Sequence, residues 1–326
     1  MNSGMEAALQ THLLERRQGL QAAISEFKDA GQLVNLLKEV DSALERIDRG
    51  SYGICQVCND SIEEETLLED PLVRMCLSHL SQEQQRAIER DLELASQVQN
   101  TLLPKRDLVT AGWQIRYHYE AAGIVSGDYC DIMASGENGD LYFLVGDISG
   151  KGVAASLLMS HLHAIFRSLV ALDLPIDKLV ERANVLFCDR SFAGRFATLV
   201  CGKAHASGTV HLCSAGHCPP IVASSSQMLD VEATGLPIGL FSSSKYSMKE
   251  IQMKHGDTIL LYTDGVSEAR NDSDRDYGTN SLRETLHNYH TLQPGELLGR
   301  CVKDLTTFRG NAPLFDDVTM MVIRRL

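Results

Sequence analysis

Residues 141–152, with the sequence LYFLVGDISGKG, constrain the fold more than any other stretch of this chain. Residues 141–146 are apolar, aromatic or glycine and precede turn-forming residues, which predicts a buried β-strand. Asp147 follows directly, and Gly150 and Gly152 then interrupt the chain before a long apolar-periodic run. A carboxylate at a strand end, beside glycines that let the backbone approach closely, suits a hard cation. A single Asp also begins many ordinary turns, so this stretch alone leaves both interpretations open.

Short apolar runs recur after residue 112 and predict many strands. They lie at 197–201, 210–213, 220–223 and 259–262, separated by Gly, Ser, Pro and Asp. Helical periodicity appears at 153–172, 176–189, 282–289 and 294–308. Strands and helices in separate blocks predict an α+β domain with helices packed on sheets.

Several aspartates share one position in this region, at the end of a predicted strand. Besides Asp147, they are Asp128 in SGDYCD, Asp264 in ILLYTDG, and the tandem Asp316 and Asp317 before VTMMVI. If these strand ends converge, the carboxylates repel one another unless cations neutralise them. All-oxygen ligands indicate Mg²⁺ or Mn²⁺. Two such ions close together activate water and stabilise an in-line displacement at phosphorus.

The N-terminal region has a different character. The first 48 residues carry helical periodicity in two pieces separated by Gly31, which predicts an antiparallel helical hairpin. Cys55 and Cys58 then form a CxxC pair, and Cys76 and His79 form a CxxH pair. Such a sulfur-rich set of four is typical of one structural zinc ion. Four unrelated residues or a redox CxxC are the alternatives; the paired spacing disfavours the first, and the lack of a surrounding strand–helix unit disfavours the second.

A helix is predicted between these two regions. Ser81 and Gln84 form a capping-box pattern, and Pro104 ends the helix. Apolar residues recur in it at near-heptad spacing: Ile88, Leu92, Ala95, Val98 and Leu102. This row packs either on its own domain or against the same row of a second protomer, and both interpretations remain open.

The segment from residue 41, DSALERIDRGSYGICQVCNDSI, resembles the zinc-finger end of the DksA/TraR family. The resemblance includes the second ligand pair, where His79 takes the place of the commoner cysteine. The chain lacks room for the long coiled coil with which full-length relatives reach RNA polymerase, so that role is not carried over.

Residues 105–326 resemble the bacterial SpoIIE/RsbU group of metal-dependent PPM (type-2C) protein serine/threonine phosphatases. The matching stretches occur in the family's order: SGDYCD, GDISGKGVAASLLMS, RFATLVCG, SAGHCPP, GLPIG, LLYTDGVSEA and DDVTMMVI. The helix sequence ERDLELASQVQNTLLP also resembles the segment that precedes such domains. Ser126, where glycine is usual, and Cys218, where asparagine is usual, are departures that remove no ligand.

This resemblance implies an αββα sandwich with two Mn²⁺ or Mg²⁺ ions at one edge of the sheets. It implies that Asp147 bridges both metals and that the carbonyl of Ile148 adds a ligand. Asp264 and Asp316 are then expected to complete the second metal's shell. Asp128 is expected to bind a metal or to orient water at one, and Asp317 is the alternative to Asp316 because the tandem makes the register ambiguous.

Two further residues in these motifs admit two interpretations each. His217 is either a general acid or, in the favoured interpretation, a structural imidazole that holds the following loop. Lys151 either contacts phosphate or is a solvated turn lysine. The remaining cysteines show no ligand-like pairing and are expected to pack in the interior.

Composition limits the class of protein. A net charge of −13 argues against broad nucleic-acid binding, and no apolar run or N-terminal pattern predicts a membrane span or a signal peptide. Nine cysteines without a disulfide framework indicate reduced thiols, and hence a cytoplasmic location. We therefore expect a hairpin with a zinc finger at 1–80, a linker helix at 81–104 and a phosphatase domain at 105–326.

The expected function is hydrolysis of phosphoserine or phosphothreonine on a regulatory protein. The resemblance implies an anti-sigma-factor antagonist of the STAS type as substrate, in a partner-switching pathway, with regulation through the zinc module and a homodimer through the linker helix. The alternative is a non-enzymatic regulator that binds RNA polymerase or another protein through the zinc module.

Overall fold

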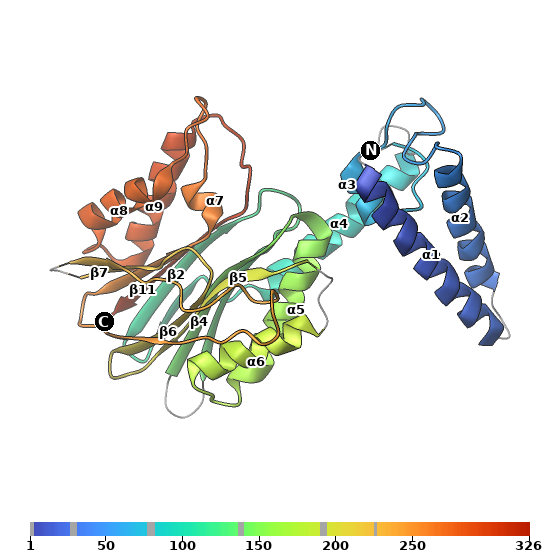
Figure 1. Ribbon diagram of the computed structural model, residues 1–326. Helices are drawn as coiled ribbons and strands as arrows, with labels where there is room; N and C mark the ends of the chain where they lie inside the picture. Colours follow the sequence, from blue (N-terminus) through green and yellow to red (C-terminus); the bar gives the residue numbers. More distant parts are fainter. Residues whose placement is uncertain (1–2, 27–30, 77–81, 136–139, 190–193, 225–226) are drawn as a thin grey trace. The chain divides into compact units, whose positions relative to one another are not determined.

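The computed structural model describes residues 3–26, 31–76, 82–135, 140–189, 194–224 and 227–326 (Figure 1). These residues form two compact units, Met1–Arg90 and Asp91–Leu326, which are described separately. The boundary lies within helix α4 (Gln82–Leu102), the helix predicted between the two regions. Ser81, the predicted cap of that helix, lies outside the described residues.

The N-terminal unit is built around helices α1 (Ser3–Glu26) and α2 (Gly31–Asp48). Leu13 of α1 and Val40 of α2 are fully buried in one hydrophobic cluster. An ion pair between Arg17 Nε and Asp41 Oδ1 (2.8 Å) joins the two helices, although both partners are about two-fifths exposed and the pair therefore contributes little. The cluster continues into the segment that contains the cysteines and the short helix α3 (Glu64–Glu69).

The C-terminal unit contains two antiparallel sheets. The first has the strand order β1 (Asp107–Thr110), β2 (Trp113–Glu120), β11 (Val318–Arg325), β10 (Thr258–Tyr262), β7 (Ile221–Ala223) and β8 (Met228–Asp230). The second has the order β3 (Asp128–Ser135), β4 (Asp140–Ile148), β5 (Ala197–Ala204), β6 (Thr209–Ala215) and β9 (Lys249–Gln252).

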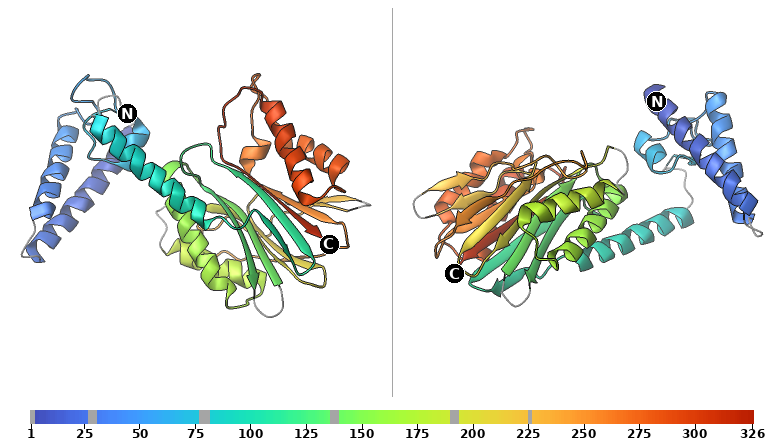
Figure 2. Two further views of the ribbon diagram at one scale, coloured as in Figure 1. Left: turned by 180° about the vertical axis from the view of Figure 1, so that it is seen from behind. Right: turned by 60° about the horizontal axis from the view of Figure 1, so that its bottom comes forward.

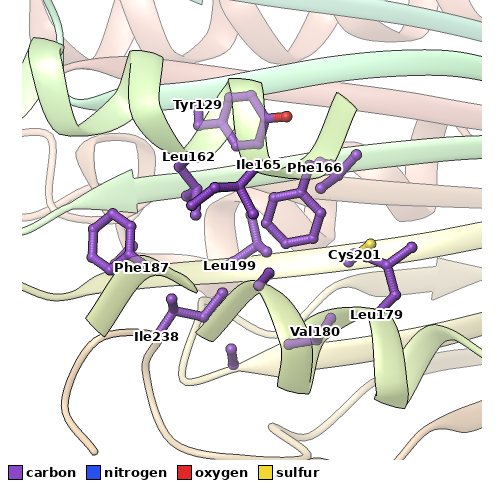
Figure 3. Packing of buried hydrophobic residues seen from close by; sticks show 14 of the residues in the cluster. Tyr129, Leu162, Ile165, Phe166, Leu179, Val180, Phe187, Leu199, Cys201 and Ile238 are labelled. Carbon is purple, nitrogen blue, oxygen red and sulfur yellow. The ribbon is translucent and has the colours of Figure 1, made fainter. Parts of the chain in front are cut away.

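Helices cover the outer face of each sheet (Figure 2). Helices α5 (Gly152–Val170) and α6 (Ile176–Cys188) pack on the second sheet, where Phe166, Phe187 and Leu199 are fully buried together (Figure 3). Helices α7 (Asp264–Ser267), α8 (Gly278–Tyr289) and α9 (Pro294–Arg309) share a cluster with the first sheet. A third cluster, with Trp113 and Phe143, fills the space between the sheets. The predicted mixed helix-and-sheet fold is thus confirmed, with the layer order helix, sheet, sheet, helix.

Strand β4 explains why the sequence is so apolar at 141–146. Side chains of a strand alternate between the two faces of its sheet. Tyr142 and Leu144 face α5 and α6, whereas Phe143 and Val145 face the other sheet, and all four are fully buried. Both faces are covered, so the strand is a continuous apolar run instead of an alternating one. Each large side chain buried in this way contributes about 1.5–3 kcal/mol.

Helix α5 is the one helix among the described residues that is long and apolar enough to cross a bilayer. Its apolar character has another explanation in this fold. Leu162, Phe166 and Leu169 lie on the face that packs on the second sheet, so the helix is part of the core.

Candidate active site

The predicted aspartates come from the ends of strands in both sheets. Asp128 begins β3 and pairs in register with Asp147 near the end of β4. In the other sheet, Asp264 follows β10, and Asp316 and Asp317 precede β11, the neighbour of β10. The sandwich therefore brings two strand ends of each sheet to a common edge.

Asp128 connects the two sheets directly. Its Oδ2 accepts hydrogen bonds from Thr263 Oγ1 (3.0 Å) and Thr319 Oγ1 (2.5 Å). Thr263 directly follows β10 and Thr319 lies in β11, and both strands belong to the first sheet. The carboxyl group is almost completely buried. Burial and the charge of Asp147 raise the pKa of Asp128 well above its usual value, although the two hydroxyl groups oppose this rise.

Asp147 lies at the centre of the negative charge. Burial, followed by the charges of Asp264, Asp316 and Asp317, raises the pKa of Asp147 to about 7. Burial and the charge of Asp316 also raise the pKa of Asp264. These carboxylates are thus close enough to repel one another, and a bound cation relieves that repulsion.

The tandem aspartates have different surroundings. Asp317 accepts hydrogen bonds from the backbone N–H groups of Ala122 and Gly127, at 2.8 Å on each of its oxygens. Asp316 instead accepts from the N–H of Asp317 (2.9 Å) and forms an ion pair with Lys151 (3.1 Å). The charges of Asp316 and Asp317 both act on Asp147, and that of Asp316 also acts on Asp264. Asp317 in addition anchors the loop that leads to Asp128 through its two backbone hydrogen bonds.

Gly127 allows a backbone oxygen to join the carboxylates. A Cβ atom at this position would lie 3.2 Å from the carbonyl oxygen of Ile148 and 3.3 Å from Asp147 Oδ1. The Ile148 carbonyl and the Asp147 carboxylate therefore face the same glycine. A larger residue at 127 would crowd the two oxygens that we expect to bind a metal.

The donor set fits hard divalent cations. It consists of carboxylate and carbonyl oxygens, and Lys151 is the cation paired with one of them. Within the described part of the chain, no three of the carboxylates bring one oxygen each within 4.8 Å of one another, as the three cysteine sulfurs do. A site for two ions about 3.5–4 Å apart needs its ligands spread over a wider space than a site for one ion, so this wider spacing suits two ions.

His217 is buried beside this edge. Its Nδ1 lies 2.8 Å from Thr198 Oγ1, and burial lowers the pKa of His217 to about 4. The imidazole is therefore neutral at physiological pH, which favours the structural interpretation. Lys151 is also held by the protein, because it donates to the carbonyl of Phe315 in addition to its contact with Asp316.

The sequence did not predict the supporting roles of four polar side chains, those of Gln99, Ser126, Thr263 and Thr319. Gln99 of α4 donates to the carbonyl of Ser126 (2.7 Å) and accepts from its N–H (3.0 Å). Ser126 Oγ in turn accepts from the N–H of Asp128 (3.0 Å). Thr263 and Thr319 both donate to Asp128. Each is a polar residue in an otherwise apolar stretch, and this could have indicated a functional role from the sequence alone.

The second acid of SGDYCD does not belong to the site. Asp131 is fully buried, and Arg167 of α5 contacts both of its oxygens at 2.8 and 2.6 Å. Asp128 and Asp131 are three residues apart in β3, and an odd separation places two side chains on opposite faces of a strand.

Three of the four predicted zinc ligands lie together in the N-terminal unit. One Sγ atom from each of Cys55, Cys58 and Cys76 lies within 4.8 Å of the others. The backbone N–H of Cys58 is the main group that lowers the pKa of Cys55. The N–H of Asp60 lowers the pKa of Cys58, but burial and the neighbouring thiols raise it to about 11. His79, the fourth predicted ligand, lies outside the described residues.

The chain is similar in sequence to several known proteins. The chain is 26% identical to Protein IcfG of Synechocystis sp. over 276 residues, covering 76% of this chain and 43% of IcfG. It is 26% identical to the phosphoserine phosphatase RsbU of Bacillus subtilis over 246 residues, covering 74% of this chain and 72% of RsbU. The chain thus spans less than half the length of IcfG.

A similar structure has also been solved. The RsbU and RsbW domains of Rv1364c from Mycobacterium tuberculosis match with a TM-score of 0.57 and 27% identity, covering 68% of this chain and 63% of that one. The model of the family "Stage II sporulation protein E (SpoIIE)" matches residues 137–326, which is more than half of the chain. The chain therefore belongs to the SpoIIE family, and its C-terminal unit is a PPM-type phosphatase domain.

Proposed function

We propose that this protein is a metal-dependent phosphatase that hydrolyses phosphoserine or phosphothreonine on a regulatory protein. One observation carries the proposal: aspartates from two sheets meet at one edge, where burial, and after it the charges of Asp264, Asp316 and Asp317, raise the pKa of Asp147 to about 7. Uncompensated carboxylates of this kind are unfavourable without cations and suit a two-metal site.

Asp147, the Ile148 carbonyl, Asp264 and Asp316 are the proposed ligands of two Mn²⁺ or Mg²⁺ ions. When bound, the ions supply an activated water and electrostatic stabilisation of the phosphoryl group. Asp128 keeps its Oδ1 available to a metal or a water, because Thr263 and Thr319 both bond its Oδ2. We assign Asp317 the role of an anchor, since backbone N–H groups occupy both of its oxygens.

The proposed substrate is a phosphorylated STAS-type antagonist of an anti-sigma factor, as the family resemblance implies. The relatives support a phosphoserine substrate: RsbU of Bacillus subtilis is a phosphoserine phosphatase, and the Mycobacterium tuberculosis protein carries an RsbU domain together with an RsbW domain. Within the described residues no disulfide is formed, and we propose a cytoplasmic location in which the thiols stay reduced.

Phosphatase assays test the proposal. Purified protein is to be incubated with phosphorylated candidate antagonists and with p-nitrophenyl phosphate, with Mn²⁺ and with a chelator. Release of phosphate that depends on Mn²⁺ supports the enzyme. Absence of turnover on every substrate, with intact fold and Mn²⁺ present, would exclude it and would favour the non-enzymatic regulator.

The N-terminal unit is proposed to hold one structural zinc ion through Cys55, Cys58, Cys76 and His79, as a DksA/TraR-like finger. The convergence of the three thiols within 4.8 Å supports this assignment. We propose three modules, a hairpin with the finger at 1–80, a linker helix at 81–104 and the phosphatase at 105–326. The finger then serves as the regulatory or docking surface.

The linker helix provides a physical route for regulation. Gln99 of α4 holds Ser126, and Ser126 holds the N–H of Asp128. Movement of α4 would therefore act on a residue of the proposed metal site. Leu94 and Val98 of the same helix are 59% and 54% exposed, which leaves apolar surface for pairing with α4 of a second protomer.

A further inference from the structure

A cavity of about 200 Å³ lies beside the carboxylate cluster. Asp316, a proposed metal ligand, and Gly265, the residue after Asp264, form part of its wall. A protein segment with its phosphoserine at the metals must pass close to this cavity. The cavity has room for side chains of such a segment, but not for a folded domain.

Two loops form the other walls. The first follows α7, and an isolated β-bridge between Arg270 and Asp276 closes it. The second follows α9 and includes Leu314 and Phe315. Phe315 is 59% exposed at this position, so a large apolar side chain is available to a passing peptide.

The basic residues that line the cavity differ in whether a carboxylate pairs with them. Arg270 forms ion pairs with Asp274 (3.0 Å) and Asp276 (3.3 Å), and Lys151 forms one with Asp316 (3.1 Å). Arg309 lines the cavity as well, and within the described ranges no carboxylate forms an ion pair with it. Its Nε donates a long hydrogen bond to the carbonyl of Ala312 (3.4 Å), which orients the guanidinium and leaves its other N–H groups available.

Three acidic residues, Glu268, Asp276 and Asp316, also line the cavity. Asp276 pairs with Arg270 and Asp316 with Lys151, and Glu268 caps α7, the short helix that begins at Asp264. Arg309 belongs to another element, the last turn of α9. The cavity thus contains acids from the region after α7 and from the loop before β11, and a guanidinium at the end of α9 that has no carboxylate partner among the described residues.

We propose that this cavity, here called the Arg309 cavity, binds the residues that flank the phosphoserine of the substrate. Arg309 pairs there with an acidic side chain of the substrate, and Phe315 packs on its neighbours. This inference rests on the proposed phosphatase function and adds a specificity-determining residue to it. A guanidinium that is half-buried and lacks a carboxylate selects for an anionic partner.

The alternative role for Arg309 is structural, because a cation in the last turn stabilises the C-terminal end of a helix. A comparison within each enzyme separates the two roles. Phosphoserine peptides are synthesised in pairs that carry either Glu or Lys at one flanking position, and the position is moved along both sides of the phosphoserine. The ratio of kcat/KM for the two peptides of a pair is then measured with Mn²⁺.

The wild-type enzyme is expected to prefer the Glu peptide at one or a few positions by about three- to tenfold. Arg309→Gln is expected to abolish this preference and Arg309→Glu to reverse it, mainly through KM. Partial unfolding lowers kcat/KM for both peptides equally, so it leaves the ratio unchanged. Lys303→Glu, an exposed charge reversal on the same helix outside the cavity, is the control and keeps the wild-type ratio.

Two outcomes would overturn the inference. One is a wild-type enzyme without charge preference at any position, and the other is an Arg309→Glu enzyme that keeps the wild-type preference. A wild-type protein that hydrolyses neither the peptides, nor p-nitrophenyl phosphate, nor the phosphorylated candidate antagonists would instead refute the phosphatase function on which the inference rests.

Discussion

Among single residues, Asp147 has the largest expected effect on catalysis. Asp147→Asn keeps the shape of the side chain but removes the charge shared by both proposed ions. We expect turnover of p-nitrophenyl phosphate in Mn²⁺ to fall by at least about 100-fold. Glu284→Gln, an exposed change on α8, is the matched control and keeps wild-type turnover. Wild-type activity of Asp147→Asn would show that the ligand assignment is wrong.

The raised pKa of Asp147 predicts how the stability of the metal-free protein depends on pH. The pKa of Asp147 rises from 3.8 to about 7 in the folded protein, so the folded state binds its proton more tightly than the unfolded state. Stability from this group is therefore present below about pH 4 and is lost as the pH rises to about 7, by at most ~1.4 kcal/mol per pH unit. His217 acts in the opposite direction, because its pKa is lowered to about 4 and its protonation destabilises the fold as the pH falls.

A difference measurement separates the two groups. Urea unfolding of wild-type protein and of Asp147→Asn, both with a chelator, cancels the contribution of His217. Asp147→Asn is expected to be increasingly more stable than wild type as the pH rises from 4 to 7, although it is inactive. Mn²⁺ should restore the stability of the wild type, by about 2.7 kcal/mol at 100 times its dissociation constant. If the difference in stability between the two proteins did not change with pH, the pKa of Asp147 would not be raised in the folded protein.

Among the structural elements, α4 is coupled to the site through one side chain. Gln99→Ala removes two hydrogen bonds and leaves the buried peptide groups of Ser126 without partners, at a cost of about 1–3 kcal/mol. Because Ser126 also positions Asp128, we expect a higher Mn²⁺ concentration for half-maximal activity. Asn100→Ala is the control, since the exposed Asn100 bonds only the carbonyl of Ser96 in its own helix. Equal Mn²⁺ dependence of the two variants would refute this coupling.

Local patterns were sufficient to predict most elements of the C-terminal unit. The apolar run at 141–146 is the centre of β4, and the helical pattern at 294–308 corresponds to α9, which begins at Pro294 and ends before Gly310 with φ of 63°. Such signals depend on near neighbours in the chain. The pairing of β2 with β11, from opposite ends of the domain, depends on contacts that no local pattern contains.

The same distinction applies to the site. Aspartates at the ends of predicted strands were visible in the sequence, and resemblance supplied their roles. The different surroundings of Asp316 and Asp317 were not visible, because Asp317 bonds the N–H groups of Ala122 and Gly127, which are distant in sequence. The role of Gln99 was hidden for the same reason, since Ser126 lies on another element. A side chain that binds backbone groups of a distant residue leaves no recognisable pattern in the sequence, because nearly every residue carries the same backbone groups.

For the whole molecule, the zinc proposal predicts two metal centres that can be separated. Wild-type protein should contain one equivalent of zinc by elemental analysis, and Cys55→Ser with Cys58→Ser should contain none. Asp147→Asn should keep the zinc, because its change lies in the other unit. Loss of zinc should also destabilise the N-terminal unit, which has a small core. Zinc retained in the double cysteine variant would contradict the ligand assignment.

The last prediction concerns the assembly of the whole molecule. Val98 and Leu94, four residues apart, expose apolar surface on one face of α4, and Leu92 is half-buried on another face. If α4 pairs with its counterpart in a second protomer, Leu92→Glu with Val98→Glu should convert a dimer to a monomer and change phosphatase activity. If the helix is only a spacer, the variant should keep the mass of the wild type. Sedimentation equilibrium, run beside activity on a phosphoprotein, distinguishes the two models, with the exposed change Glu93→Gln as control. A wild-type protein that is monomeric throughout the concentration range of the assay, with activity indifferent to deletion of residues 1–80, would exclude regulation by dimerisation.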